Sequence, residues 1–280
     1  MEKFFMVNEN FDRIINNTLE NNFNVFLIEN LIPISTGWTN IVYKVETNKG
    51  NYYFRFPRDE FWERTIVKDS QFANYIIGKT SFKTSEINLD YDNGRPFSYH
   101  REIPGKTLAD VMNNLSEFDI DKISFQISQF MNELHNIKYN ENEVFSVDNI
   151  GLNLNDFITE LLDKHVSQND KSFWKFYHFG GENECLVHGD FNSSNILLDE
   201  NNNVVAVIDF GFGGFGNKYM DISRIIGRCP FHFKNSIIKN YEEIDNHSLN
   251  LDLLDNDIKA WNSIDSGYIN YMAKIGIYKK

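Results

Sequence analysis

The sequence has few cysteines, a shortage of basic residues and no long hydrophobic run, and each of these excludes a class of protein. Its two cysteines, Cys185 and Cys229, form neither a metal-ligand pattern nor a disulfide framework, which favours a reducing, cytoplasmic location. Lysine and arginine number 27 against 40 aspartate and glutamate residues. The resulting formal net charge of −13 argues against a nucleic-acid partner, because proteins that bind nucleic acids are normally basic. No stretch of about 18 apolar residues occurs, so we expect no transmembrane helix and no membrane partner.

The chain also lacks the signals of export and of modular linkers. Residues 1–10 contain no basic segment followed by an apolar run, so no signal peptide is expected. We find no internal repeat and no linker rich in Gly, Ser or Pro. The 280 residues, 41% of them hydrophobic, suffice for two lobes that each bury a core.

The first part of the chain predicts a helix followed by a hairpin of two strands. Apolar residues recur at helical spacing in 11–19, and strands are expected at 41–45 and 52–56. The turn between these strands lies at 48–51, where Asn and Gly tolerate positive φ. Pro57 ends the second strand because it has no amide donor.

A second helix and a further strand follow. The helix is expected at 61–77, and the strand at 98–103 comes after a turn at 92–94. The pair Pro104-Gly105 then breaks the chain, which makes it the predicted boundary between two lobes.

We therefore expect an N-terminal lobe at 1–103 and a C-terminal lobe at 104–280. The second lobe should be mainly helical with one β-hairpin. Its expected elements are an amphipathic helix, a less regular helical region, the hairpin and a helical tail, at 120–137, 154–179, 196–208 and from 220 onward. The predicted fold class is α+β, with a β-rich N-terminal lobe, a mostly α-helical C-terminal lobe and a ligand cleft between them.

Polar residues stand at both outer ends of the predicted hairpin. Asp190 and Asn195 precede its first strand, and Asp209 follows its second strand. Because the two ends of a hairpin lie side by side, Asn195 and Asp209 should be neighbours, with Asp190 close by. Phosphoryl transfer needs such a set: one carboxylate takes the proton of the acceptor hydroxyl, while a second carboxylate and an amide oxygen hold Mg²⁺. The competing interpretation is a hairpin with ordinary turn residues, since Asp and Asn favour turns.

The linked motifs His-Gly-Asp-x-x-x-x-Asn at 188–195 and Ile-Asp-Phe-Gly at 208–211 resemble those of the aminoglycoside phosphotransferase and choline kinase superfamily. These proteins are the small-molecule branch of the protein-kinase-like fold. The resemblance implies a bilobal kinase fold, Asp190 as the catalytic base, and Asn195 and Asp209 as ligands of Mg²⁺. It is close in the motif region, holds in outline for the nucleotide lobe and is weak at the C-terminal end.

The resemblance also implies nucleotide-binding residues in the first lobe. Ser35, Thr36 and Gly37 precede a strand, where these kinases place the loop that covers the phosphates. Arg55 takes the place of the phosphate-binding lysine, in an Arg-x-Pro pattern similar to that of macrolide kinases. Arginine holds phosphate through two hydrogen bonds and stays charged. The alternative for Arg55 is a solvated arginine at the edge of a sheet.

Two further parts of the nucleotide site are implied less directly. The family pairs its phosphate-binding cation with a carboxylate on the next helix, for which Asp69 is the candidate and Glu63 the rival. Residues 99–105 resemble the hinge that binds the adenine edge, with Arg101 and Ile103 contributing backbone groups. Such contacts do not reveal whether ATP or GTP is the phosphate donor.

Three alternatives concern the reaction and the acceptor. A protein kinase is disfavoured, because only eleven residues separate Asp209 from Asp221 and no proline follows before Pro230, which leaves no peptide-docking segment. A nucleotide-binding pseudokinase is disfavoured by the complete catalytic set. We expect an antibiotic kinase of the aminoglycoside or macrolide type first, and a choline or amino-alcohol kinase second.

The acceptor is expected to be a small, cationic molecule. The negative net charge would attract a cation, and seven carboxylates gather in the stretch that begins after Tyr241. These residues would either contact the acceptor or form a solvated helix face: Glu242, Glu243, Asp245, Asp252, Asp255, Asp257 and Asp265. Asp221 is expected to brace the catalytic loop, with direct contact to the substrate as the alternative.

Overall fold

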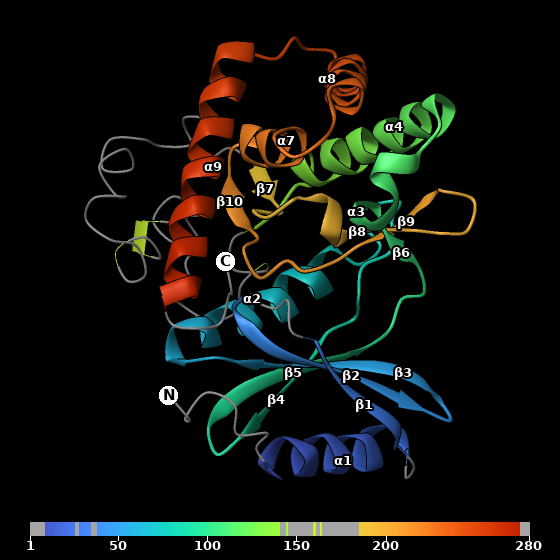
Figure 1. Ribbon diagram of the computed structural model, residues 1–280, viewed down its shortest axis with the longest axis vertical. Coiled ribbons are helices and arrows are strands. Elements are labelled where there is room, and N and C mark those ends of the chain that lie inside the picture. Colours follow the sequence, from blue (N-terminus) through green and yellow to red (C-terminus); the bar gives the residue numbers. More distant parts are fainter. Residues whose placement is uncertain are drawn as a thin grey trace.

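The computed structural model describes residues 9–25, 28–34, 38–140, 144, 159–160, 163 and 185–274. It has two lobes, a small one built around a twisted sheet and a larger, mostly helical one (Figure 1). This confirms the predicted α+β, bilobal fold. Within these described ranges, no helix combines the length and the apolar character needed to cross a membrane.

The small lobe contains a five-stranded antiparallel sheet in the order β1-β2-β3-β5-β4. Its strands are β1 Ile28–Ile34, β2 Asn40–Thr47, β3 Gly50–Pro57, β4 Asn88–Asp92 and β5 Arg95–Arg101. Helices α1 Glu9–Phe23 and α2 Glu60–Ile76 lie on opposite faces of this sheet (Figure 1). Side chains alternate between the two faces of a strand. Tyr52, Phe54 and Phe56 of β3 therefore pack in one core with α1, while Arg55 points to the face of α2 and the cleft.

Both predicted turns of this sheet are present. In the β4–β5 turn, Asn93 and Gly94 have φ values of 51° and 82°, the conformation that makes Asn-Gly favourable in a tight hairpin. Strands β1 and β4 were not predicted. They are the two edges of the sheet, and their partly exposed residues carry no clear pattern of alternation.

The large lobe is built from helices and two small sheets. Its longer helices are α4 Glu117–His135, α7 Lys218–Ile226, α8 Phe231–Asp245 and α9 Leu251–Lys274, after the short α3 Leu108–Val111 and the 3-10 helix η1 Met112–Asn114. One sheet joins β6 Lys106–Thr107, β8 Ile196–Leu198 and β9 Val204–Val207, and the other joins β7 Cys185–Val187 to β10 Gly214–Gly216. The hairpin predicted at 196–208 is thus confirmed, as are the helices expected at 61–77 and 120–137. The helical region expected at 154–179 lies almost wholly outside the described residues, and the lobe boundary at 103/104 stays a prediction.

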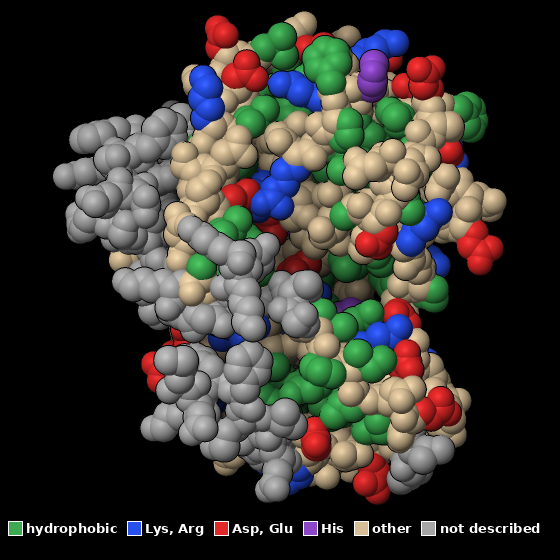
Figure 2. Space-filling model, viewed as in Figure 1, with side chains coloured by type: hydrophobic (Ala, Val, Ile, Leu, Met, Phe, Trp, Pro, Cys, Tyr) green, Lys and Arg blue, Asp and Glu red, His purple; other side chains and the backbone are tan. Residues whose placement is uncertain are grey.

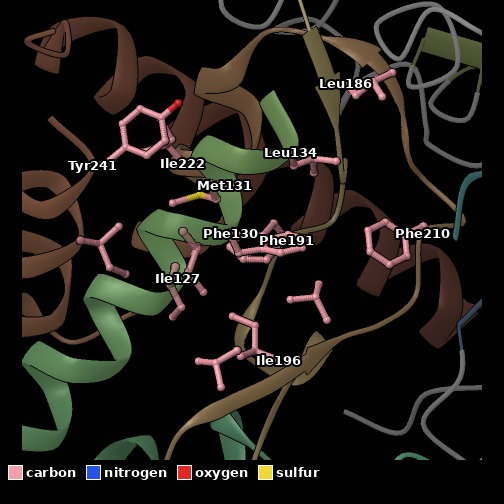
Figure 3. Close-up of a cluster of buried hydrophobic side chains, with 14 of the residues drawn as sticks. Ile127, Phe130, Met131, Leu134, Leu186, Phe191, Ile196, Phe210, Ile222 and Tyr241 are labelled. Carbon is pink, nitrogen blue, oxygen red and sulfur yellow. The ribbon is translucent and has the colours of Figure 1, made fainter. Parts of the chain in front are cut away.

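A continuous apolar core supports the loop that follows β7. Figure 3 shows Phe130 of α4 lying against Phe191, which belongs to the first motif. Phe210 of the second motif is part of the same core and stacks on Phe72 of α2. Phe130 of α4 stacks on Phe191 with ring centroids 5.4 Å apart. The residues that flank Asp190 and Asp209 are therefore anchored in the core, which fixes the backbone of both motifs.

A second apolar cluster joins α9 to the small lobe. It includes Trp62 of α2 and Trp261 of α9, and Trp38 packs against it from the segment before β2. Trp38 also stacks on Tyr268 of α9, with ring centroids 4.9 Å apart. Helix α9 therefore contacts both lobes at one side of the cleft.

Candidate active site

The predicted catalytic residues meet at one cavity of about 600 Å³ between the lobes. This volume lies in the range of small-molecule sites. The space-filling view shows a hollow between the lobes with acidic and basic side chains around it (Figure 2). The lining includes Asp190, Asn195 and Asp209 from the large lobe and Arg55 and Asp69 from the small lobe.

Asp221 fixes the backbone of the loop that carries Asp190. Its carboxylate accepts hydrogen bonds from the amides of His188, at 2.8 Å, and Gly189, at 2.9 Å. It also lies 3.2 Å from Nε2 of His135, whose Nδ1 is 2.9 Å from the hydroxyl of Tyr241. Asp221 is fully buried and does not line the cavity. These contacts support the interpretation of Asp221 as a brace.

His188 joins the loop to the end of β9. The Asp190 amide donates to Nδ1 of His188 at 3.3 Å, and Nε2 of His188 donates to the Ile208 carbonyl at 3.0 Å. The ring is fully buried and packs 4.5 Å from the ring of Phe210. His188 therefore ties the two motifs together from the core side.

Asn195 and Asp209 lie side by side at the ends of the hairpin. The Ile208 amide donates to the Asn195 carbonyl at 3.0 Å, the last rung before the strands separate. The Asn195 side chain donates from Nδ2 to the carbonyl of Asp190 at 3.0 Å, which turns its Oδ1 atom into a candidate ligand atom. Asp209 adopts φ 68°, an uncommon conformation for a residue with a side chain, and its carboxylate is 46% exposed. Such backbone conformations cluster at functional sites.

The oxygen atoms of Asn195 and Asp209 fit a magnesium site. Mg²⁺ prefers hard oxygen ligands and is usually held by one or two side chains, with water and phosphate completing its shell. Within the described ranges, no cluster of three His, Cys, Asp or Glu residues forms an all-protein metal cage. A site of two protein ligands that relies on a nucleotide is consistent with both observations.

Asp69 connects Arg55 to the second motif. One of its oxygens pairs with Nη1 of Arg55, and the other accepts the Phe210 amide at 2.7 Å. Arg55 also lies 3.6 Å from Asp209. Burial raises the pKa of the Asp69 carboxyl to about 6, against the opposing effects of the Arg55 guanidinium and the Phe210 amide. The rival residue, Glu63, pairs instead with Arg95 at 2.9 Å, away from the cavity.

Of the other residues predicted to bind the nucleotide, only some lie at the cavity. Ser35, Thr36 and Gly37 lie outside the described residues. Ile103 lines the cavity, whereas Arg101 is not among its lining residues. Burial lowers the pKa of His100 to about 4, so its neutral ring donates from Nδ1 to the Arg101 carbonyl at 2.9 Å.

Several cavity residues were missed by the sequence analysis. Glu102 accepts hydrogen bonds from Asn51 at 2.5 Å and Lys44 at 3.0 Å, and His100 lines the cavity beside it. Arg224 of α7 contacts the Asp190 carboxylate at 2.8 Å. The only signal for Arg224 was its position three residues after Asp221 on a helix.

The acidic stretch after Tyr241 mostly lies away from the cavity. Of its seven carboxylates, only Asp265 is among the lining residues, and it pairs with Arg224 and Arg228. Glu242 accepts the Leu249 amide at 2.8 Å, and Glu243 pairs with Lys239 on the same helix. Glu242 and Glu243, which the sequence analysis offered as acceptor contacts, therefore do not face the site.

Comparison with known proteins gives a family and a set of similar folds. Residues 30–243 match the phosphotransferase enzyme family. The hydroxylysine kinase of Mus musculus is 23% identical over 146 residues, which cover 44% of this chain and 38% of that kinase, so the match spans less than half of either protein.

Several solved structures of phosphotransferases have a fold similar to that of this chain. The GDP and kanamycin complex of APH(2")-IIIa superposes with a TM-score of 0.72 and 18% identity, covering 94% of this chain and 92% of that one. The macrolide 2'-phosphotransferase MphH from Brachybacterium faecium superposes with a TM-score of 0.64 and 12% identity, covering 95% and 93% of the two chains. The identities are low, so these likenesses show the fold.

Proposed function

Because this chain belongs to the phosphotransferase enzyme family, we propose that it transfers the γ-phosphate of ATP or GTP to a hydroxyl group of a small molecule. One observation carries the proposal: Asp190, Asn195 and Asp209 line the same cavity as the buried pair Arg55–Asp69. These are the parts that phosphoryl transfer needs, a proton acceptor, oxygen ligands for a metal and a cation for phosphate.

In this mechanism Asp190 accepts the proton of the acceptor hydroxyl. The hydroxyl oxygen forms a bond to the γ-phosphorus while the bond between that phosphorus and the β-phosphate oxygen breaks, leaving ADP or GDP. Arg55, held by Asp69, binds the phosphates and keeps them in line with the hydroxyl. Most of the acceleration comes from this positioning and from charge stabilisation rather than from covalent chemistry.

Asn195 and Asp209 would hold the metal through their side-chain oxygens. When bound, Mg²⁺ supplies positive charge to the β- and γ-phosphates. The contact of the Phe210 amide with Asp69 fixes the backbone beside Asp209. The hydrogen bond from the Ile208 amide to the Asn195 carbonyl fixes the backbone at Asn195.

For the acceptor, we propose an antibiotic of the aminoglycoside or macrolide type first, with a positive charge. The net charge of −13 and the similarity in fold to antibiotic phosphotransferases support this choice. A choline-like amino alcohol is second. The relative named hydroxylysine kinase adds a hydroxylated amino acid to the acceptors that deserve a test.

The test is release of ADP or GDP by the purified protein with kanamycin, erythromycin, choline and hydroxylysine, each with and without Mg²⁺. Metal-dependent nucleotide turnover that one acceptor stimulates is the expected result. Asp190→Asn is the control, because it keeps the shape of the site and removes the base. Nucleotide binding without any turnover would instead favour a pseudokinase that acts as an interaction module.

A further inference from the structure

We propose that Arg224 is a positioning residue that sets the orientation of the Asp190 carboxylate, and that Asp265 and Trp261 hold Arg224 in place. The inference rests on the proposed function, because it assigns a partner to the proposed base. It adds a requirement that the two sequence motifs do not contain. Arg224 lies on α7 and Asp265 on α9, both outside 188–195 and 208–211.

The backbone and the side chain of Asp190 are held by different partners. Its carbonyl accepts hydrogen bonds from Asn192 and Asn195, both at 3.0 Å, and its amide donates to His188. None of these contacts fixes the rotation of the carboxylate. Among the described residues, only Arg224 donates hydrogen bonds to that carboxylate.

The two carboxylate oxygens of Asp190 have different surroundings, because Arg224 binds only one of them. Nε and Nη2 of Arg224 both lie 2.8 Å from Oδ1 of Asp190. Two donors in the plane of one guanidinium define the direction of that oxygen, as a single ammonium group would not. With Oδ1 held on the side of α7, Oδ2 is the oxygen that can take the acceptor proton. Asp190 itself lines the cavity, and its side chain is 28% exposed.

The Arg224 side chain is itself fixed by residues of α9. Its side chain is only 7% exposed, Nη1 donates to Oδ2 of Asp265 at 2.7 Å, and the guanidinium lies 4.6 Å from the ring centroid of Trp261. Trp261 in turn donates from Nε1 to the Met220 carbonyl at 3.1 Å, which ties α9 to α7. All three guanidinium nitrogens therefore bind a carboxylate, and Trp261 covers the face of the guanidinium through a cation–π contact.

Charge balance explains why this arrangement is stable. Burying a guanidinium is costly unless carboxylates compensate for the lost water. Burial by itself would lower the pKa of Arg224, but Asp190 and Asp265 together raise it, so Arg224 stays charged. Asp265 is therefore needed as a second anion, because Arg224 must keep its charge while Asp190 gains a proton during each turnover.

The experiment compares wild type, Arg224→Ala and Arg224→Lys, measured by ADP or GDP release with water and with each acceptor of the panel above. We expect kcat to fall roughly 10- to 100-fold in both variants, since a misplaced catalytic group has effects of this size. The nucleotide KM should change by less than about twofold, because the Arg224 contacts all lie outside the Arg55–Asp69 pair. Arg95→Ala is the control for loss of an arginine, because Arg95 forms an exposed ion pair with Glu63 outside the cavity.

Chemical rescue separates positioning from a purely structural role. Guanidinium ions at non-denaturing concentration should restore part of the kcat of Arg224→Ala by entering the vacated space, and should not restore Asp190→Asn. Full activity in Arg224→Lys, or a folded Arg224→Ala variant with wild-type kcat, would overturn the inference. Failure of guanidinium to raise the kcat of a folded Arg224→Ala would also overturn it. If Arg224→Ala does not fold, the kcat of Arg224→Lys decides.

Failure of the proposed function looks different. A wild-type protein that releases no ADP or GDP with any acceptor or with water removes the proposed base and this inference with it. An active wild type with fully active Arg224 variants removes the inference alone.

Discussion

Replacing Asp221 by Asn tests whether the Asp221 carboxylate anchors the loop that carries Asp190. The Asp221 carboxylate is fully buried and accepts the amides of His188 and Gly189. An Asn at this position keeps one acceptor oxygen, but its NH₂ group would face the second amide, donor against donor. A hydrogen bond to a charged acceptor contributes about 1.5–3 kcal/mol, and a buried donor left without a partner costs about 1–3 kcal/mol. We therefore expect Asp221→Asn to lower the free energy of unfolding by about 3 kcal/mol.

The same substitution should lower kcat, because the segment that loses its anchor carries Asp190. Urea unfolding followed by circular dichroism measures the stability, and nucleotide turnover measures kcat and both KM values. Asp199→Asn is a matched control: Asp199 also accepts two amides, from Asn201 and Asn203, but in an exposed turn away from the cleft. It should leave turnover at the wild-type level. If Asp221→Asn has wild-type stability and a raised acceptor KM, Asp221 does not anchor this loop, and direct contact with the acceptor is favoured instead.

Four further outcomes are expected. Asp190→Asn should lower turnover by ~10²–10⁴-fold without changing the circular dichroism spectrum, as loss of a general base does; near-normal turnover would contradict the assignment. Asp209→Ala should abolish the Mg²⁺-dependent part of nucleotide binding in calorimetry, and undiminished affinity would exclude Asp209 from the metal site. Arg55→Ala should raise the nucleotide KM roughly tenfold and lower kcat, whereas unchanged parameters would make Arg55 structural only. The nucleotide KM of the wild type should rise as the pH falls through about 6, because the Asp69 carboxyl, whose pKa is raised, takes up a proton and no longer anchors Arg55. This pH dependence should be absent in Asp69→Asn and should persist in the control variant Glu63→Gln.

The parts of the site that were predictable from sequence are those made by residues close together in the chain. Asn195 and Asp209 lie side by side because one short hairpin connects them, and the turn residues at its tip predicted that hairpin. The amphipathic pattern of α4 likewise predicted the helix that supports Phe191. Local spacing and periodicity are sufficient for such features.

The parts that were not predictable depend on contacts between distant segments. The bond from the Phe210 amide to Asp69 joins residues 141 positions apart, and a carboxylate on a helix gives no sign of such a partner. Arg224 meets Asp190 and Asp265 only after α7 and α9 have packed. The edge strands β1 and β4 escaped detection because an edge has one neighbour and needs no regular burial pattern.

The apolar cluster at the side of the cleft gives the protein an intrinsic optical reporter. Three of its four tryptophans, Trp38, Trp62 and Trp261, lie in or against this cluster. One belongs to the segment before β2, one to α2 and one to α9, so the indole rings come from both lobes. A change in the separation of the lobes alters the packing and water contact of these rings, and therefore their fluorescence. Emission spectra recorded during a nucleotide titration would thus report a change in the separation of the lobes without an attached label.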